Sequence, residues 1–207
     1  MLAAHPKAYA GIGSRETPTA VLAVLEALAA VLARAGLVLR SGGAPGADAA
    51  FEAGADRASG VKEIYLPWKK FNGNESERFT VPKEAFALAE EYHPLGAGLR
   101  ANQASHKLIA RNCQQILGQK LDSPVAFVVC WTAGGRLVGG TAQALRIAVE
   151  RGIRVANLGD GATLREISSE LALAREVERS RRRSGDVSLQ LAPDGLDRAS
   201  RSLGPDL

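Results

Sequence analysis

The sequence predicts an α/β protein with a Rossmann-like parallel sheet and helices on both of its faces. Short apolar segments alternate with segments of helical periodicity along most of the chain, which is the pattern of βαβ units. Residues 125–130 are apolar at every position, as expected of a strand covered on both faces. Glycine-rich loops recur between a predicted strand and a predicted helix, where folds of this class bind ligands.

The first strand is predicted over residues 8–12, an apolar run that is followed by glycine. A helix should begin at Thr17 and Pro18, because threonine is a good N-cap and proline is favoured in the first turn. Apolar residues then recur at helical spacing until Gly36 ends the pattern. They are Val21, Leu25, Leu28 and Leu32.

The same order of strand, glycine loop and helix repeats over residues 37–39, 42–46 and 48–58, and residues 63–66 form the next predicted strand. Residues 67–82 are polar and aromatic without a clean period, which indicates an inserted loop rather than a core element. Helices over 83–92 and 103–117 precede the strand at 125–130, the expected centre of the sheet.

A helix over residues 141–151, a strand over 154–157 and a helix over 163–179 complete the predicted order. Residues 1–180 are therefore expected to form one nucleotide-binding domain. Residues 181–207 are rich in Ser, Gly, Asp, Pro and Arg, which is typical of a flexible polar and basic tail.

The amino-acid composition excludes several classes of protein. With 207 residues and 46% apolar side chains, the chain can build a sizeable core. Its apolar stretches are too short or interrupted to span a bilayer, so we expect a soluble, cytoplasmic protein without a membrane partner. Cys113 and Cys130 lack metal-ligand spacing, and we expect neither a metal nor a disulfide. The net charge of +4 is compatible with a phosphate-bearing partner.

Three loops are the candidate ligand-binding elements: residues 11–15, 41–48 and 134–141. In a parallel sheet they meet at one edge, where helix N-termini favour an anion. Ser14, Ser41 and Thr141 add hydroxyl groups, and Arg15 adds a guanidinium. The other interpretation is that the glycines only form tight turns. Bulk at Gly43 is expected to abolish nucleotide binding while the protein stays folded.

No loop has the lysine of a triphosphate-binding loop or the third glycine of a dinucleotide fingerprint. ATP hydrolysis and NAD chemistry are therefore disfavoured, and no cofactor is predicted.

The motifs GIGSRETP, LRSGGAPGADAAFEAGA, ARNCQQILG and GGTAQALRIAVERGIRVANLG, in this order, resemble the Rossmann-like domain of the DprA/Smf DNA-processing proteins. That domain belongs to the SLOG superfamily, which includes the LOG phosphoribohydrolases. The resemblance spans residues 8–160 and implies a fold that binds a nucleotide or a nucleic acid.

Residue by residue, the resemblance covers three DprA motifs, and its matching positions are Gly13, Ser14, Arg15, Ser41, Gly42, Gly46, Asp48, Arg111 and Asn112. The chain has two glycines after Ser41 where DprA has one, and no winged-helix domain follows Asp160. Gly140 and Thr141 align with the LOG motif, but Ala144 stands at the position of its glutamate.

Other residues have two interpretations each. Asp48 and Glu52 lie one helical turn apart and are a candidate acid/base pair, whereas Asp48 is about equally expected as an N-cap. Trp68 and Phe71 offer rings for stacking on a base, or they are buried beneath a lid. Arg111 reaches the loops or forms a surface salt bridge.

We therefore expect a protein that binds a phosphorylated nucleotide or nucleotide derivative as a sensor, carrier or sequestering protein, and that forms a homo-oligomer. The alternatives are a LOG-type hydrolase that uses Asp48 and Glu52, and a DprA-like single-strand DNA-binding protein. The expected binding residues are Gly11, Gly13, Ser14, Arg15, Ser41, Gly42, Gly43, Gly46, Asp48, Trp68, Arg111, Asn112, Thr132, Gly139, Gly140 and Thr141.

Overall fold

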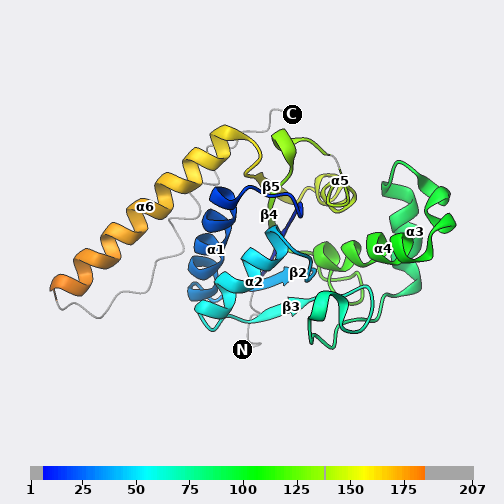
Figure 1. Ribbon diagram of the computed structural model, residues 1–207, viewed down its shortest axis with the longest axis horizontal. Helices are drawn as coiled ribbons and strands as arrows, with labels where there is room; N and C mark the ends of the chain where they lie inside the picture. The colour runs from blue at the N-terminus through cyan, green and yellow to red at the C-terminus, as the bar shows by residue number, and fades with distance from the viewer. Residues whose placement is uncertain (1–6, 138, 185–207) are drawn as a thin grey trace.

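The computed structural model describes residues 7–137 and 139–184 and has a sheet of five parallel strands in the order β3-β2-β1-β4-β5 (Figure 1). The strands are β1 (Ala8–Gly13), β2 (Val38–Ser41), β3 (Lys62–Ile64), β4 (Phe127–Trp131) and β5 (Arg154–Asn157). The predicted α/β Rossmann-like class is confirmed. The strand order reverses between β1 and β4, so the carboxyl ends of these two neighbours form the topological switch point of the sheet.

Six α-helices and three 3₁₀ helices belong to the described residues. The α-helices are α1 (Thr19–Arg34), α2 (Ala47–Arg57), α3 (Lys83–Tyr92), α4 (Gln103–Leu117), α5 (Ala142–Glu150) and α6 (Gly161–Ser184). The 3₁₀ helices are η1 (Phe71–Gly73), η2 (Gly96–Ala101) and η3 (Ala133–Gly135). The bounds of α3, α4 and β5 are those that the sequence predicts. None of the described helices is both long and apolar enough to cross a membrane.

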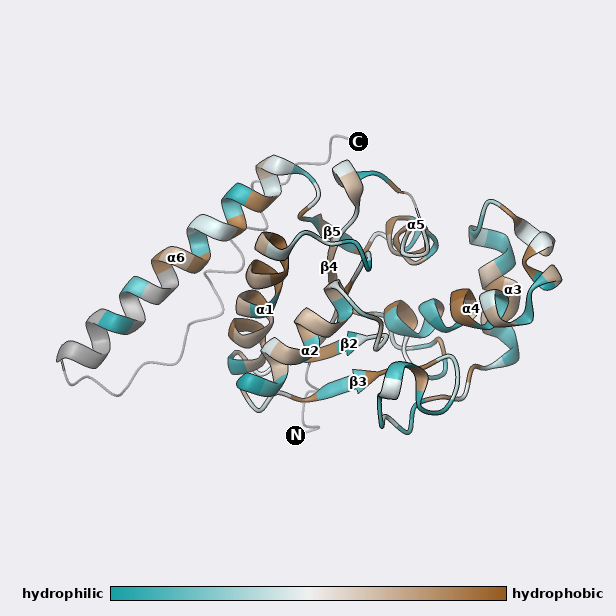
Figure 2. Ribbon diagram, viewed as in Figure 1, coloured by the Kyte–Doolittle hydropathy of each residue, from teal (hydrophilic) through white to brown (hydrophobic). Residues whose placement is uncertain are grey.

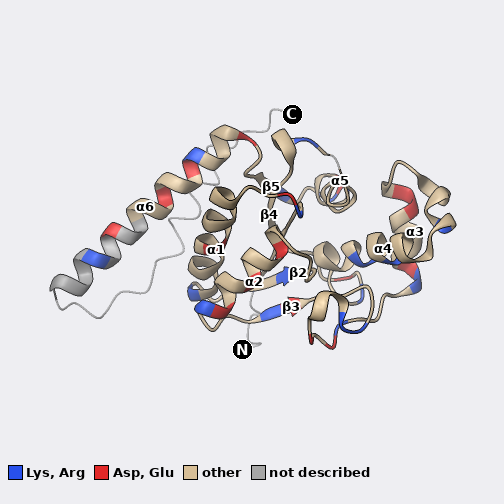
Figure 3. Cartoon of the chain, viewed as in Figure 1, with Lys and Arg blue, Asp and Glu red and all other residues tan. Residues whose placement is uncertain are grey.

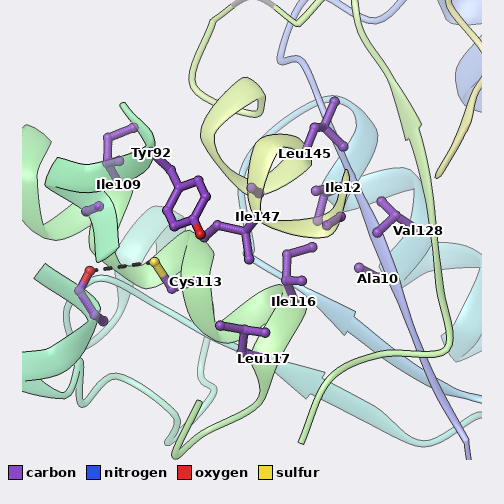
Figure 4. Close-up of a cluster of buried hydrophobic side chains, with 14 of the residues drawn as sticks. Ala10, Ile12, Tyr92, Ile109, Cys113, Ile116, Leu117, Val128, Leu145 and Ile147 are labelled. Carbon is purple, nitrogen blue, oxygen red and sulfur yellow. Dashed lines mark hydrogen bonds between the residues drawn. The ribbon is translucent and has the colours of Figure 1, made fainter. Parts of the chain in front are cut away.

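Successive side chains of a strand point to opposite faces of the sheet, so the central strands contribute to a core on each face. Ala10 and Ile12 of β1 lie in the cluster formed with α3, α4 and α5 (Figure 4). In that cluster the Cys113 thiol donates a hydrogen bond to the Ala85 carbonyl over 3.6 Å. Tyr9, on the opposite face of β1, lies in the second cluster with residues of α1 and α2. Figure 2 shows that α1 is strongly hydrophobic along its length, as a helix packed between neighbours should be.

The start of α1 differs from the prediction. The helix begins at Thr19, and its N-cap position is Pro18, with no capping side chain. Thr17 is not the cap, because its hydroxyl donates to the Ser14 carbonyl over 2.7 Å. The threonine thus closes the turn after β1 instead of capping the helix.

The insert, residues 67–82, is more than a surface loop. It contains η1, and Phe71 in that short helix is only 5% exposed and belongs to the core cluster on the α1 and α2 face. The segment is a loop, as predicted, around one short 3₁₀ helix, and it also contributes the Phe71 side chain to the core. Its aromatic residues lacked a period because the segment contributes isolated side chains to the core rather than a helical face.

Helix α6 continues to Ser184, beyond the predicted end at residue 179 and past the expected domain boundary at 180. It runs outward past α1, and Figure 3 shows residues of both charge signs along it. The flexible tail was predicted for residues 181–207; residues 181–184 belong to α6, and residues 185–207 lie outside the described part of the chain.

Candidate functional site

The candidate site lies at the carboxyl edge of the sheet, where α1, α2 and α5 begin. None of these three helices has a side chain that caps its N-terminus. The start of α6 is different, because the Asp160 carboxylate accepts hydrogen bonds from Ala162 N over 3.3 Å and from Thr163 N over 3.1 Å. No side chain caps these helices, although Asp48 lies in the first turn of α2, and the starts of α1 and α5 carry no acidic residue in their first turns, which favours an external anion there.

The first loop connects neighbouring elements through the backbone of Ser14. Its amide donates to the Trp131 carbonyl over 3.1 Å, and its carbonyl accepts from Ala47 N over 3.2 Å. The Ser14 hydroxyl accepts a hydrogen bond from Glu16 N over 3.1 Å. Arg15, the next residue, is exposed. The loop therefore holds an exposed guanidinium between β4 and the start of α2.

A buried pair of opposite charges lies under the second loop. Arg111 of α4 places Nη1 4.0 Å from Oδ2 of Asp48 in α2, and both side chains are at most 5% exposed. Burial raises the pKa of Asp48 from 3.8 to about 6 despite the nearby guanidinium. Burial, against the opposing charge of Asp48 and with a smaller contribution from the charge of Arg15, lowers the pKa of Arg111 to about 10. Arg15 and Arg111 therefore lie close enough for their charges to interact, beside the carboxylates of Asp48 and Glu52.

Arg111 is held by partners that the sequence analysis did not identify. With the Gln115 amide turned so that both neighbours are satisfied, its oxygen accepts from Arg111 Nη1 and from Gly42 N, each over 3.0 Å. The Nε of Arg111 is buried without a hydrogen-bond partner. Gln115 follows Arg111 by one helical turn, so the sequence spacing alone indicates that these two side chains can interact. Arg111 is thus not in a surface salt bridge.

Glycine in the first two loops makes room for other parts of the protein. A Cβ atom on Gly11 would lie 2.5 Å from the Phe51 ring, and one on Gly13 would lie 2.7 Å from the Ala47 Cβ. A Cβ on Gly42 would lie 1.5 Å from Arg111 Nη1. Packing alone therefore accounts for glycine at these three positions.

Gly43 and Gly46 have the positive φ angles that favour glycine, +64° and +83°. A Cβ on Gly43 would also lie 2.8 Å from a methyl group of Leu66. Bulk at Gly43 should therefore strain the fold as well as block a ligand, because both the backbone angle and Leu66 oppose a side chain there.

The third loop is open by comparison. Gly139 has a φ of +72°, and a Cβ there would meet no described atom within 4 Å. A Cβ on Gly140 would meet only a methyl group of Ile109, at 4.0 Å. Asn112 of α4 donates its amide to the Gly140 carbonyl over 2.9 Å. Asn112 therefore positions the turn in front of Thr141 and the start of α5, while Gly140 itself is exposed.

Ser41 and Thr132 are bound by the protein itself. The Ser41 hydroxyl donates to the Gly11 carbonyl over 2.7 Å. Asn157 donates to the Thr132 hydroxyl over 2.7 Å, and its oxygen accepts from the Thr132 amide over 3.1 Å. Asn157, which the sequence analysis did not single out, thus fixes the end of β4.

The two carboxylates of the candidate acid/base pair, Asp48 and Glu52, have different partners. Asp48 is not the N-cap of α2, a position held by Gly46; its Oδ2 accepts instead from Ala44 N over 3.4 Å. Glu52 accepts a hydrogen bond from Asn74 over 3.0 Å, and Lys62 lies 3.9 Å from the same oxygen. Asp48 is thus the carboxylate associated with Arg111, whereas Glu52 interacts with the insert and β3.

Trp68 and Phe71 lie in different environments. Phe71 is buried, with the Arg111 guanidinium 5.8 Å from its ring centre. Trp68 is 37% exposed and meets Phe71 edge to face at 5.1 Å. Burial applies to Phe71 alone, so Trp68 keeps a surface for contact with another molecule.

Two surface hollows lie outside the first two glycine loops, and one of them is lined in part by Leu137 of the third loop. One of about 540 Å³ is between α3 and α5, where Arg146 already donates to the carbonyls of Tyr92 and Leu137. Another of about 390 Å³ lies against the insert beside Lys70 and Phe79. Among the residues that the structure describes, no three His, Cys, Asp or Glu side chains gather as metal ligands.

No protein-family model matches the sequence, and no curated protein matches it. Among solved structures, the chain is similar to the Moco carrier protein of Chlamydomonas rheinhardtii, with 16% identity and a TM-score of 0.47 over 82% of this chain and 86% of that one. It is also similar to DNA processing protein A from Helicobacter pylori, a single-stranded DNA-binding protein, with 18% identity and a TM-score of 0.49 over 83% and 81% of the two chains. At such identities the likeness concerns the fold alone.

Proposed function

We propose that the chain binds a phosphorylated nucleotide or nucleotide derivative at the carboxyl edge of its sheet. The observation that carries the proposal is the pair of interacting arginines at this edge, the exposed Arg15 and the buried Arg111, whose Nη1 lies 4.0 Å from Asp48. Arginine is well suited to phosphate because its planar guanidinium forms paired hydrogen bonds.

Three uncapped helix N-termini support the same assignment, because α1, α2 and α5 direct the positive ends of their dipoles to this edge. The switch point between β1 and β4 is the usual ligand position in sheets of this order. The order of motifs that resembles SLOG domains also favours a nucleotide. In this arrangement Arg15 and the backbone amides before α5 contact the phosphate, and the positive charge of the buried Arg111 attracts it from beneath the second glycine loop.

Isothermal calorimetry with nucleoside mono-, di- and cyclic phosphates tests the proposal. Arg15→Ala should weaken binding, and Gly140→Trp should abolish it, because both positions are exposed and a Cβ on Gly140 would have no described neighbour closer than 4.0 Å. Arg151→Ala is the matched control, since Arg151 is exposed at the opposite end of α5. Circular dichroism checks folding. Equal affinity in a folded Gly140→Trp variant and the wild type would contradict the proposal.

One observation favours a second function, hydrolysis of an N-glycosidic or phosphoribosyl bond. The pKa of Asp48 is raised by burial to about 6, close to the pH at which a general acid or base works well. Chromatography of nucleotides incubated with the protein detects a released base. Asp48→Asn should remove that turnover while largely preserving binding.

A further inference from the structure

The insert borders the same edge of the sheet as the glycine loops. It follows β3, and Asn72 donates its amide to the Gly43 carbonyl over 3.1 Å. Asn74 donates to Glu52 of α2 over 3.0 Å. At its far end, the Arg78 carbonyl accepts from Leu66 N over 2.8 Å. The insert is therefore fastened directly to the β2–α2 loop, beside the residues proposed to meet phosphate.

Two aromatic rings of the insert, Phe71 and Trp68, lie between the buried Arg111 guanidinium and solvent. The Arg111 guanidinium lies 5.8 Å from the centre of the Phe71 ring, which is 5% exposed. The Trp68 ring centre lies 5.1 Å beyond, perpendicular to Phe71. Trp68 thus stands one ring away from the arginine, at the point where this row of side chains reaches solvent.

The backbone that holds Trp68 is locally constrained. Lys70 and Asn72 have positive φ angles of 60° and 51°, which non-glycine residues seldom adopt. The side chain of Asn72 is one of the groups that hold this conformation, through its bond to Gly43. Packing against Phe71 further restrains the indole, so a partner that meets it encounters a ring already in place.

Trp68 differs from the other large apolar side chains that the structure describes as exposed. The others are aliphatic: Val61, Leu95, Leu137, Val149 and Leu173. An indole offers a flat π surface, and every nucleobase has a matching face, so stacking suits a base of any sequence. Lys69 and Lys70 follow Trp68 and are exposed, and Lys70 lies 3.6 Å from the Glu75 carboxylate.

We propose that Trp68 is the residue that recognises the base of the ligand, so that the site selects intact nucleotides over sugar phosphates. This inference rests on the proposed function, and it assigns the two ends of the ligand to different elements. The phosphate meets the glycine loops, and the base stacks on Trp68 of the insert.

Calorimetry with adenosine, guanosine, cytidine and uridine monophosphates and with ribose 5-phosphate tests the assignment. Trp68→Ala should weaken binding of the nucleotides about 5- to 150-fold, the usual loss for a stacked base, and leave ribose 5-phosphate binding unchanged. Trp68→Phe should retain most of the affinity, because it keeps an aromatic face. Leu95→Ala, at an exposed position in the α3–η2 connection, is the control and should change neither.

Fluorescence supplies a readout that a purely structural role would not move. The chain has two tryptophans, and Trp131 ends β4 near the proposed phosphate site, so the Trp68 signal is the difference between the wild type and Trp68→Phe. Nucleotides should quench the wild type more strongly than Trp68→Phe, and ribose 5-phosphate should quench the two equally. Equal binding of nucleotides and ribose 5-phosphate would overturn the role of Trp68 and leave the phosphate site standing. A similar loss for both classes of ligand in Trp68→Ala would overturn it too. Absence of binding by all five compounds would refute the proposed function, and the assignment of Trp68 with it.

Discussion

Replacing Gly42 with alanine should show whether this glycine exists to accommodate Arg111. The φ angle of Gly42 is not positive, so alanine suits the backbone. Its Cβ, however, would lie 1.5 Å from Arg111 Nη1, which must retreat to at least 3.4 Å to reach an ordinary contact. The guanidinium cannot do so without disturbing its contacts with Asp48, Gln115 or Phe71.

The expected cost follows from that displacement. Overfilling a packed interior costs about 1–3 kcal/mol, and complete separation of a buried ion pair costs about 3–5 kcal/mol. We expect Gly42→Ala to lower the free energy of unfolding by about 1–3 kcal/mol, because a guanidinium at the end of a flexible side chain shifts before its pair with Asp48 breaks.

Urea denaturation followed by circular dichroism measures this cost in two backgrounds. In Arg111→Met, the side chain ends before the atoms that meet the new Cβ, so Gly42→Ala should cost less there, with a coupling energy of at least about 1 kcal/mol. Gly140→Ala is the matched control, since a Cβ there has no neighbour closer than 4.0 Å. An equal cost of Gly42→Ala in both backgrounds would refute the reasoning.

Further predictions concern pH, the loops, nucleic acid and the chain end. Because the pKa of Asp48 is higher in the folded protein than its ordinary 3.8, its protonation stabilises the fold, and this contribution is lost as the pH rises from about 4 past 6. Wild type should lose about 3 kcal/mol more than Asp48→Asn over that range in urea titrations; parallel curves would contradict the shift. Arg15→Ala should lower nucleotide affinity by about 1.5–3 kcal/mol in calorimetry, and an unchanged affinity would exclude a phosphate contact. Binding of single-stranded DNA should be weak and decline steeply with salt in anisotropy titrations, so tight binding at high salt would argue for a DprA-like role. Removal of residues 186–207 should leave the melting temperature nearly unchanged, because that segment lacks a periodic apolar face; a large decrease would show that it docks.

The sequence was sufficient to predict the parallel sheet, because continuous apolar strands and helical periodicity are local properties. Its failures are at positions decided by distant partners. The second strand was expected to end at residue 39, yet β2 continues through the buried Arg40 to Ser41. Arg40 lies opposite Glu63 in the neighbouring strand and forms an ion pair with it at 2.6 Å. In a sequence, a charged residue after an apolar run indicates the end of a buried strand, and only the structure shows the cross-strand partner that allows it to be buried.

In the candidate site, too, the sequence was sufficient for local features but not for contacts between distant residues. The three glycine loops could be located from their spacing, and the match around Arg111 and Asn112 identified a helix that does reach these loops. Gln115 and Asn157 were missed because amide side chains carry no motif of their own. Their roles arise only when folding brings Gly42 and Thr132 within hydrogen-bond distance.

Glycine-rich loops alone are weak indicators of a ligand, because glycine answers two different needs. At Gly11, Gly13 and Gly42 the space that a side chain would occupy is already filled by Phe51, Ala47 or Arg111, so substitution should reduce stability. At Gly140 that space is open, so a side chain should leave the fold intact and affect only a molecule that approaches the start of α5. Comparing stability with affinity at Gly42 and Gly140 therefore distinguishes a glycine required by the fold from one required by the ligand, a distinction that the sequence motif cannot make.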